Sequence, residues 1–174
     1  MTLQECKDQL ARMSVNKTGC KKAPHKAVLL LAILELIEEK LIDTEFIPLS
    51  VSLVHKFEKV WKEYVPADSR FQCKINYPFY HLASSPFWEL IKLPTFEERQ
   101  EYSLSALKRS FAGAVIKSDL FALFQKESYR EEIRKLLIDT YLSQNGPYPS
   151  IDAIARMAAE GSTLFIAIIT QLIA

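Results

Sequence analysis

The stretch KKAPHKAVLLLAILELIEEK, residues 21–40, decides the fold. Almost every residue from Ala27 to Ile37 is apolar, and a helix that is apolar all round must be surrounded by protein. Pro24 stands just before this run, where a helix tolerates proline well because the first N–H groups have no partner inside the helix. We therefore predict a helix from Pro24 to about Lys40 that forms the centre of the core.

The beginning of this helix is unusually basic for a core element. Lys21 and Lys22 precede Pro24, and His25 and Lys26 follow it. Free N–H groups and the helix dipole attract an anion at a helix N-terminus, and lysine side chains add full positive charges there. The combination predicts that an anion such as a DNA phosphate binds at this point. The alternative is that the lysines are only a solvated rim.

Helical spacing of apolar residues recurs on both sides of the central helix. Thr2 followed by Glu5 has the pattern of a capping box and predicts a helix over about residues 2–14. A second amphipathic segment begins at Ser50 and ends before Pro66, and the chain returns to helical spacing in ESYREEIRKLLIDTYL, residues 127–142. These segments predict a bundle of helices packed around the apolar one.

One segment favours β structure. In YHLASSPFWELI, residues 80–91, the small polar turn ASSP separates two apolar, aromatic-rich runs. We predict a hairpin with strands near Tyr80–Ala83 and Phe87–Ile91. The predicted fold class is therefore mainly α (α+β), a helical bundle with a small antiparallel β-hairpin.

Length and composition place one domain and a tail in the chain. With 174 residues, 49% of them hydrophobic, the chain is long enough to bury one sizeable core, and we predict a recognition domain over residues 1–144. Residues 145–174 are predicted to be a separate helical and apolar tail. Its last twelve residues, TLFIAIITQLIA, are fewer than the roughly 20 that cross a membrane. We interpret them as a packing element, a surface for a protein partner or a tail exposed by truncation, in that order of preference.

The residue types that carry catalysis or hold metals do not occur in suitable patterns. Cys6, Cys20 and Cys73 form no CxxC pair, and the three histidines are too far apart for zinc-ligand spacing. Four glycines form no phosphate-binding loop, and no serine or cysteine lies in a recognisable nucleophile motif. These patterns indicate a binding module that is not an enzyme and has no metal or cofactor. Because no apolar signal segment begins the sequence, we expect a cytoplasmic protein.

Two motifs together make the chain similar to a known family. PHKAVLLLAIL (24–34) and YPFYHLASSPFWEL (77–90), followed by LKRSF and REEIRKLLIDTYL, resemble the sulfur-binding domain of modification-dependent restriction enzymes over roughly residues 1–142. That family recognises DNA whose backbone carries a phosphorothioate, and it commonly precedes an HNH nuclease domain. The resemblance implies double-stranded DNA as the partner. Since the sequence has no His-Asn-His arrangement, it also implies binding without cleavage, with any nuclease as a separate partner.

The resemblance implies a position for the sulfur. Carried over by position, Tyr77, Pro78 and His81 would form a small surface pocket, with His25 and Lys26 at its rim. His81 occupies a position where a small residue is expected, and Lys26 one where arginine is frequent. A wider set of basic residues would hold neighbouring phosphates: Lys17, Lys21, Lys22, Arg70, Lys74, Lys108 and Arg109.

The chemistry of the ligand agrees with such a pocket. Sulfur in place of a non-bridging oxygen is larger, softer and less strongly hydrated, while the group keeps its negative charge. A protein that reads it needs an apolar hollow beside cations, and a tyrosine next to a rigid proline can form that hollow with little loss of side-chain entropy.

Two other functions remain open from the sequence. The chain could be a DNA-binding module indifferent to sulfur, in which His81 fills the pocket and the basic residues hold phosphates. It could instead be a protein-interaction domain whose partner docks on residues 163–174. Salt separates them, because DNA binding that releases counterions weakens steeply as salt rises, whereas an apolar interface responds little.

Overall fold

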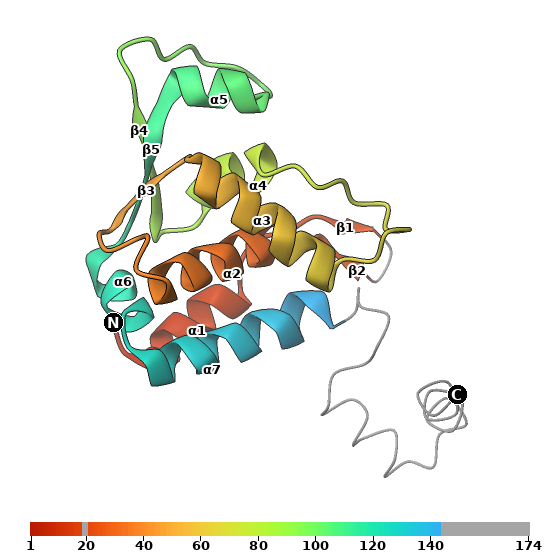
Figure 1. Ribbon diagram of the computed structural model, residues 1–174, viewed down its shortest axis with the longest axis vertical. Coiled ribbons are helices and arrows are strands. Elements are labelled where there is room, and N and C mark those ends of the chain that lie inside the picture. Colours follow the sequence, from red (N-terminus) through yellow and green to blue (C-terminus); the bar gives the residue numbers. More distant parts are fainter. Residues whose placement is uncertain (19–20, 144–174) are drawn as a thin grey trace.

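The structure is a computed structural model that describes residues 1–18 and 21–143 (Figure 1). Its α-helices are α1 (Leu3–Ala11), α2 (His25–Glu38), α3 (Val51–Tyr64), α4 (Asn76–His81), α5 (Leu104–Ser110), α6 (Ser118–Phe124) and α7 (Glu127–Leu137). A 3-10 turn, η1 (Leu82–Ser84), follows α4, and a π-helical turn, η2 (Ile138–Leu142), follows α7. The strands are β1 (Lys17–Thr18), β2 (Lys21–Lys22), β3 (Phe46–Pro48), β4 (Trp88–Lys92) and β5 (Phe111–Ile116). The predicted tail, residues 145–174, lies outside the described residues.

Helix α2 is the central element, as predicted. All of its residues from Lys26 to Leu34 are buried, and α1, α3 and α7 lie around it (Figure 1). The helix begins immediately after Pro24, whose carbonyl accepts a 2.9 Å hydrogen bond from the Val28 N–H. It ends where Lys40 takes a left-handed conformation, with φ of 57°. The predicted helices at residues 2–14 and 50–65 are also confirmed, as α1 and α3, with slightly tighter ends.

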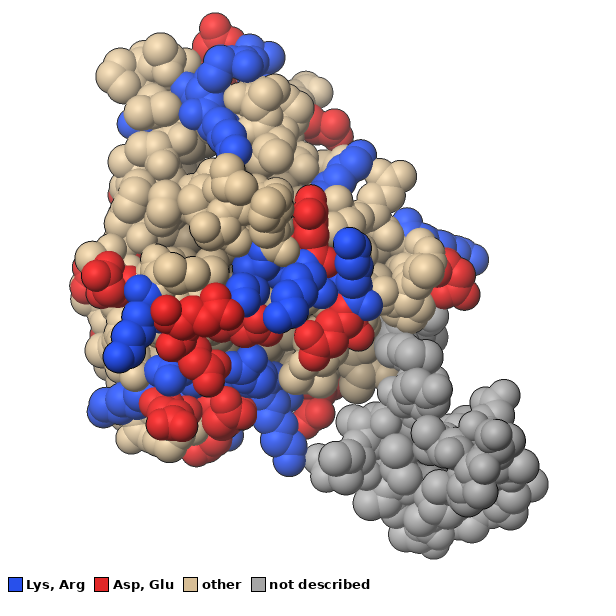
Figure 2. All heavy atoms as spheres, viewed as in Figure 1, with Lys and Arg blue, Asp and Glu red and all other residues tan. Residues whose placement is uncertain are grey.

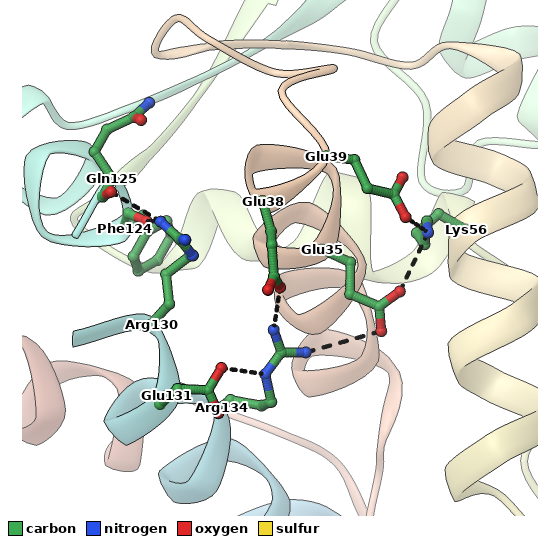
Figure 3. Close-up of polar contacts among 9 residues, drawn as sticks. All are labelled: Glu35, Glu38, Glu39, Lys56, Phe124, Gln125, Arg130, Glu131 and Arg134. Carbon is green, nitrogen blue, oxygen red and sulfur yellow. Dashed lines mark hydrogen bonds and ion pairs between the residues drawn. The ribbon is translucent and has the colours of Figure 1, made fainter. Parts of the chain in front are cut away.

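An ionic network fixes α3 and α7 to the second half of α2 (Figure 3). The Arg134 guanidinium of α7 pairs with Glu38 at 2.8 Å and with Glu35 at 3.9 Å, while Lys56 of α3 pairs with Glu35 at 3.3 Å and Glu39 at 2.5 Å. Glu35 therefore receives cations from two different helices. The acidic end of α2 is therefore occupied by structural contacts.

The predicted fold class, mainly α with a small antiparallel β element, is confirmed, and the strand predicted near Phe87–Ile91 is β4, but the strand predicted at Tyr80–Ala83 and its hairpin pairing are wrong. Tyr80–Ala83 is helical, in α4 and η1, and β4 pairs with β5 and not with the segment before it. Pro78 is the third residue of α4, where its missing N–H removes no hydrogen bond within the helix. The three-stranded sheet has the order β3-β5-β4, so the central strand comes from FAGAVI, residues 111–116, a segment whose surroundings in the sequence favour helix.

The sheet carries a projection from the helical body. Strands β4 and β5 extend away from α2, and α5 lies at their far end (Figure 1). Helix α4 bridges the two parts, because it packs against α2 and against α5. The Trp88 indole of β4 donates a 3.0 Å hydrogen bond to the Phe79 carbonyl, which fixes α4 to the sheet. Within the described residues, no helix is both long and apolar enough to cross a membrane.

Candidate functional site

A pocket of about 640 Å³ opens where the N-terminus of α2 meets α4. Helix α2 contributes His25 and Lys26, and α4 contributes Tyr77, Pro78 and His81. The structure thus brings all five residues of the proposed sulfur pocket to one cavity, although 50 residues lie between Lys26 and Tyr77 in the sequence. Arg70, Ser84 and Glu101 also line it.

One turn of α4 forms the apolar wall. Tyr77 and His81 are four residues apart and so lie on the same side of the helix, next to the Pro78 ring. Tyr77 is half-buried, and the Lys74 ammonium lies 5.5 Å from the centre of its ring. The wall therefore combines an aromatic ring, a rigid pyrrolidine and an imidazole, with a cation close to its outer side.

His25 acts as a structural support for the pocket. Its ring lies 4.7 Å from the Trp61 ring and 6.2 Å from the Tyr77 ring, measured between centroids. Its Nε2 is 2.8 Å from the Gln72 carbonyl, and since a carbonyl can only accept, this nitrogen carries a proton. Burial lowers the pKa of His25 below its usual 6.5, and the Gln72 hydrogen bond opposes part of that shift. His25 therefore joins α2 to the loop that carries Arg70.

Lys26 places a positive charge at the edge of the apolar wall. The residue is only 7% exposed, and its Nζ donates a 3.0 Å hydrogen bond to the Ser84 hydroxyl. Among the described residues, no carboxylate forms an ion pair with it. Burial lowers its pKa, because a charged ammonium is stabilised less in the protein than in water. An anion in the pocket would restore the missing counter-charge.

His81 lines both this pocket and a second hollow of about 420 Å³, whose lining also includes Tyr80, Phe96 and Phe111. Its pKa is lowered, first by burial and then by the positive charge of Lys26, while Glu101 raises it. In the described part of the chain, neither of its ring nitrogens has a hydrogen-bond partner. The ring nitrogens are thus available to a ligand.

The other predicted basic residues are spread over several elements. Arg70 lines the pocket and Lys74 lies beside Tyr77, whereas Lys17, Lys21 and Lys22 belong to the β1–β2 hairpin near the start of α2. Lys22 donates a 3.3 Å hydrogen bond to the Thr140 carbonyl and lies 5.1 Å from the Tyr141 ring centre.

Lys108 and Arg109 are in the last turn of α5, on the projection, and line neither hollow. On the face drawn in Figure 2, basic and acidic side chains are intermixed over the lower half of the molecule. Of the predicted cations, Arg70 lines the pocket and Lys74 lies beside Tyr77, whereas Lys108 and Arg109 are on the projection.

Sequence reasoning missed Ser84 and Glu101. The sequence places Ser84 in a polar turn, although its position three residues after His81 indicates a hydroxyl that can bond to the end of α4. Glu101 belongs to a segment with several acidic residues, so no sequence signal distinguishes it from its neighbours.

A comparison with protein families decides the class of this protein. The model of the ScoMcrA-like DNA sulfur-binding domain matches residues 4–149. The chain belongs to this family. No curated protein matches the sequence. The matched region includes both motifs and the whole pocket, and it identifies a domain that binds sulfur-modified DNA, with no nuclease domain identified in the chain.

Proposed function

We propose that this sulfur-binding domain holds the phosphorothioate with its sulfur against Tyr77 and Pro78 and its negative charge beside Lys26. The observation that carries the proposal is the buried Lys26 ammonium, which lacks a carboxylate partner among the described residues and adjoins the apolar wall of α4. A buried charge is costly unless it is paired. A ligand that is anionic and has one soft, weakly hydrated atom matches both parts of the pocket.

The apolar wall supplies the discrimination between sulfur and oxygen. Removing apolar surface from water is favourable by roughly 25 cal/mol per Å², and a sulfur atom gains more from the Tyr77–Pro78 surface than a strongly hydrated oxygen does. Lys26 attracts either form of the phosphate, because both carry a negative charge. We therefore propose that Lys26 supplies affinity for both duplexes and that the Tyr77–Pro78 surface supplies the preference for the phosphorothioate.

The basic residues outside the wall give affinity without preference. Arg70 lies at the same pocket and makes no ion pair with the described residues, so it is placed for a phosphate next to the modified one. The remaining residues of the proposed phosphate set are Lys17, Lys21, Lys22, Lys74, Lys108 and Arg109. Contacts to unmodified phosphates position the duplex and carry no information about the sulfur.

The domain is proposed to bind and not to cut. Among the described residues, no group of three or more histidine, cysteine, aspartate or glutamate side chains is placed to hold a metal ion. Cleavage, where it follows recognition, is assigned to a separate nuclease, and the place of action is the cytoplasm, where the DNA is. Incubation of modified plasmid with the protein and magnesium or manganese should leave the plasmid intact; nicking that co-purifies with the protein would contradict this part.

The central experiment is a competition between two duplexes of one sequence, one with a single phosphorothioate and one without. We expect tighter binding of the modified duplex, with both affinities falling as salt rises. Lys26→Met should weaken both complexes, because it removes the charge while keeping a side chain of similar length. Equal affinity of the parent protein for the two duplexes would instead favour a DNA-binding module that is indifferent to sulfur.

A further inference from the structure

The Ser84 hydroxyl links two walls of the pocket. It accepts a 3.0 Å hydrogen bond from the Lys26 ammonium, and it donates a 2.8 Å hydrogen bond to the backbone carbonyl of His81. Lys26 belongs to α2, whereas His81 is the last residue of α4, the helix that carries Tyr77 and Pro78. A single hydroxyl therefore connects the cation of the pocket to its apolar wall.

The ammonium depends on this connection. A lysine side chain has four flexible methylene groups, so a cation that must occupy one place needs a partner that fixes it. Within residues 1–18 and 21–143, Ser84 Oγ is the one hydrogen-bond acceptor of Lys26 Nζ, and no carboxylate pairs with it. Because Ser84 in turn bonds to the end of α4, the position of the ammonium is defined relative to that helix and not merely relative to α2.

We infer that Ser84 is a positioning residue for sulfur recognition. Its hydroxyl holds the Lys26 ammonium at the edge of the Tyr77–Pro78 wall, so that one phosphorothioate group meets the cation with its charge and the wall with its sulfur. The inference rests on the proposed function of the pocket. Neither the family match nor the sequence motifs assign a role to Ser84.

A purely structural role for Ser84 makes different predictions. The hydrogen bond to His81 lies at a helix end, where serine hydroxyls commonly bond to a carbonyl three residues earlier. If this were its only role, Ser84→Ala would lower the stability of the fold without acting through Lys26. Ser84 is exposed, so the alanine variant leaves no cavity in the core.

The test is a double-mutant cycle on the full chain with Ser84→Ala, Lys26→Met and the combined variant. Affinities are measured for the phosphorothioate duplex and for its unmodified counterpart. We expect Ser84→Ala to weaken binding of both duplexes about tenfold, the loss typical of a hydrogen bond to a charged group, because Lys26 attracts either form of the phosphate. Ser84→Thr keeps the hydroxyl and should restore most of the affinity. Ser52→Ala, at an exposed serine of α3, is the matched control and should bind as the parent does.

A pH profile gives a second measurement that a structural role would not change. Without the hydroxyl, the charged form of Lys26 loses a hydrogen bond, so its pKa falls further. Binding that needs the charged ammonium should then be lost at a lower pH in Ser84→Ala than in the parent. In the Lys26→Met background, this difference should vanish.

Each outcome separates the two proposals. If Ser84→Ala has no further effect in the Lys26→Met background, Ser84 acts through Lys26 as inferred. If it weakens binding equally in both backgrounds, or has no effect in the parent, the inference is overturned, while the proposed function stands as long as Lys26→Met weakens binding. If Lys26→Met binds both duplexes as the parent does, the inference and the assignment of Lys26 fail together.

Discussion

Lys26 and His81 line the same pocket from two different helices, and the positive charge of the first lowers the pKa of the second. The two groups repel each other when both are protonated. An anion placed between them would reverse this effect, because its negative charge favours the protonated imidazole. The pocket thus combines the Lys26 ammonium with an imidazole whose protonation that ammonium disfavours.

We predict that binding of phosphorothioate DNA becomes tighter as the pH falls toward the lowered pKa that His81 has in the free protein. The bound anion raises the pKa of His81, so complex formation takes up a proton, and for one proton the affinity changes by at most about tenfold per pH unit. Fluorescence anisotropy between pH 5 and 8 measures this slope. His81→Ala should remove this pH dependence. Glu101 already raises the pKa of His81 in the free protein, so it should make the further rise on binding, and therefore the slope, smaller.

The size of the His81 side chain gives a separate outcome at neutral pH. If the imidazole narrows the space beside Pro78, His81→Ala should increase the preference for sulfur by enlarging the hollow. If the imidazole donates to a phosphate oxygen, the same variant should weaken binding of both duplexes. An unchanged pH slope and unchanged affinities in His81→Ala would show that His81 does not contact the ligand.

Tyr77→Ala is the direct test of the apolar wall. Removal of the ring should cost about 1–2 kcal/mol in binding of phosphorothioate DNA, because less apolar surface is buried, and much less for unmodified DNA. Tyr77 is half-buried and packs near His25, so circular dichroism and thermal unfolding must first show that the variant is folded. A folded Tyr77→Ala protein with the discrimination of the parent would move the sulfur contact away from this wall.

The phosphate contacts should be visible in the salt dependence. Arg70→Ala and Lys74→Ala are each expected to weaken binding of both duplexes alike and to reduce the slope of log affinity against log salt by about 0.9 for each phosphate that the variant no longer neutralises. Lys59→Ala is the matched control, since Lys59 is exposed on α3 and lines neither hollow. A slope that stays the same in Arg70→Ala would exclude that residue from the interface.

The sequence predicted the central helix and the clustering of the site better than it predicted the sheet. Helix α2 is specified locally, by an apolar run and the proline that precedes it, and the residues carried over from the family resemblance line one pocket. The sheet depends on pairing between segments far apart in the chain, and FAGAVI reads equally well as a buried helical turn. The contact of Ser84 with Lys26 has no sequence signal for a similar reason, because the two residues are 58 positions apart.

The sequence identified the basic residues but did not predict where their side chains lie relative to the pocket. Their sequence positions gave no indication that Lys22 bonds to Thr140, or that Lys108 and Arg109 would stand on a projection. The positions of these side chains depend on how η2 and α5 pack against the rest of the fold, and a single sequence does not specify that packing.

The last prediction concerns Gly113, which lets the sheet form. A Cβ at this position would lie 2.6 Å from the Ile47 carbonyl oxygen and 2.7 Å from the Phe46 ring. The ring can turn away, but the carbonyl belongs to the neighbouring strand β3 and cannot move without disturbing its pairing with β5. We expect Gly113→Ala to lower the free energy of unfolding by about 1–3 kcal/mol, as overpacking typically does. Urea unfolding followed by circular dichroism measures this change in the free energy of unfolding.

Ala112→Ser, at the exposed neighbour of Gly113 in β5, is the control and should change the free energy of unfolding by less than about 0.5 kcal/mol. Phe46→Ala should rescue Gly113→Ala only partly, because the carbonyl contact remains. Full rescue would show that the ring, and not the strand backbone, is what requires glycine here.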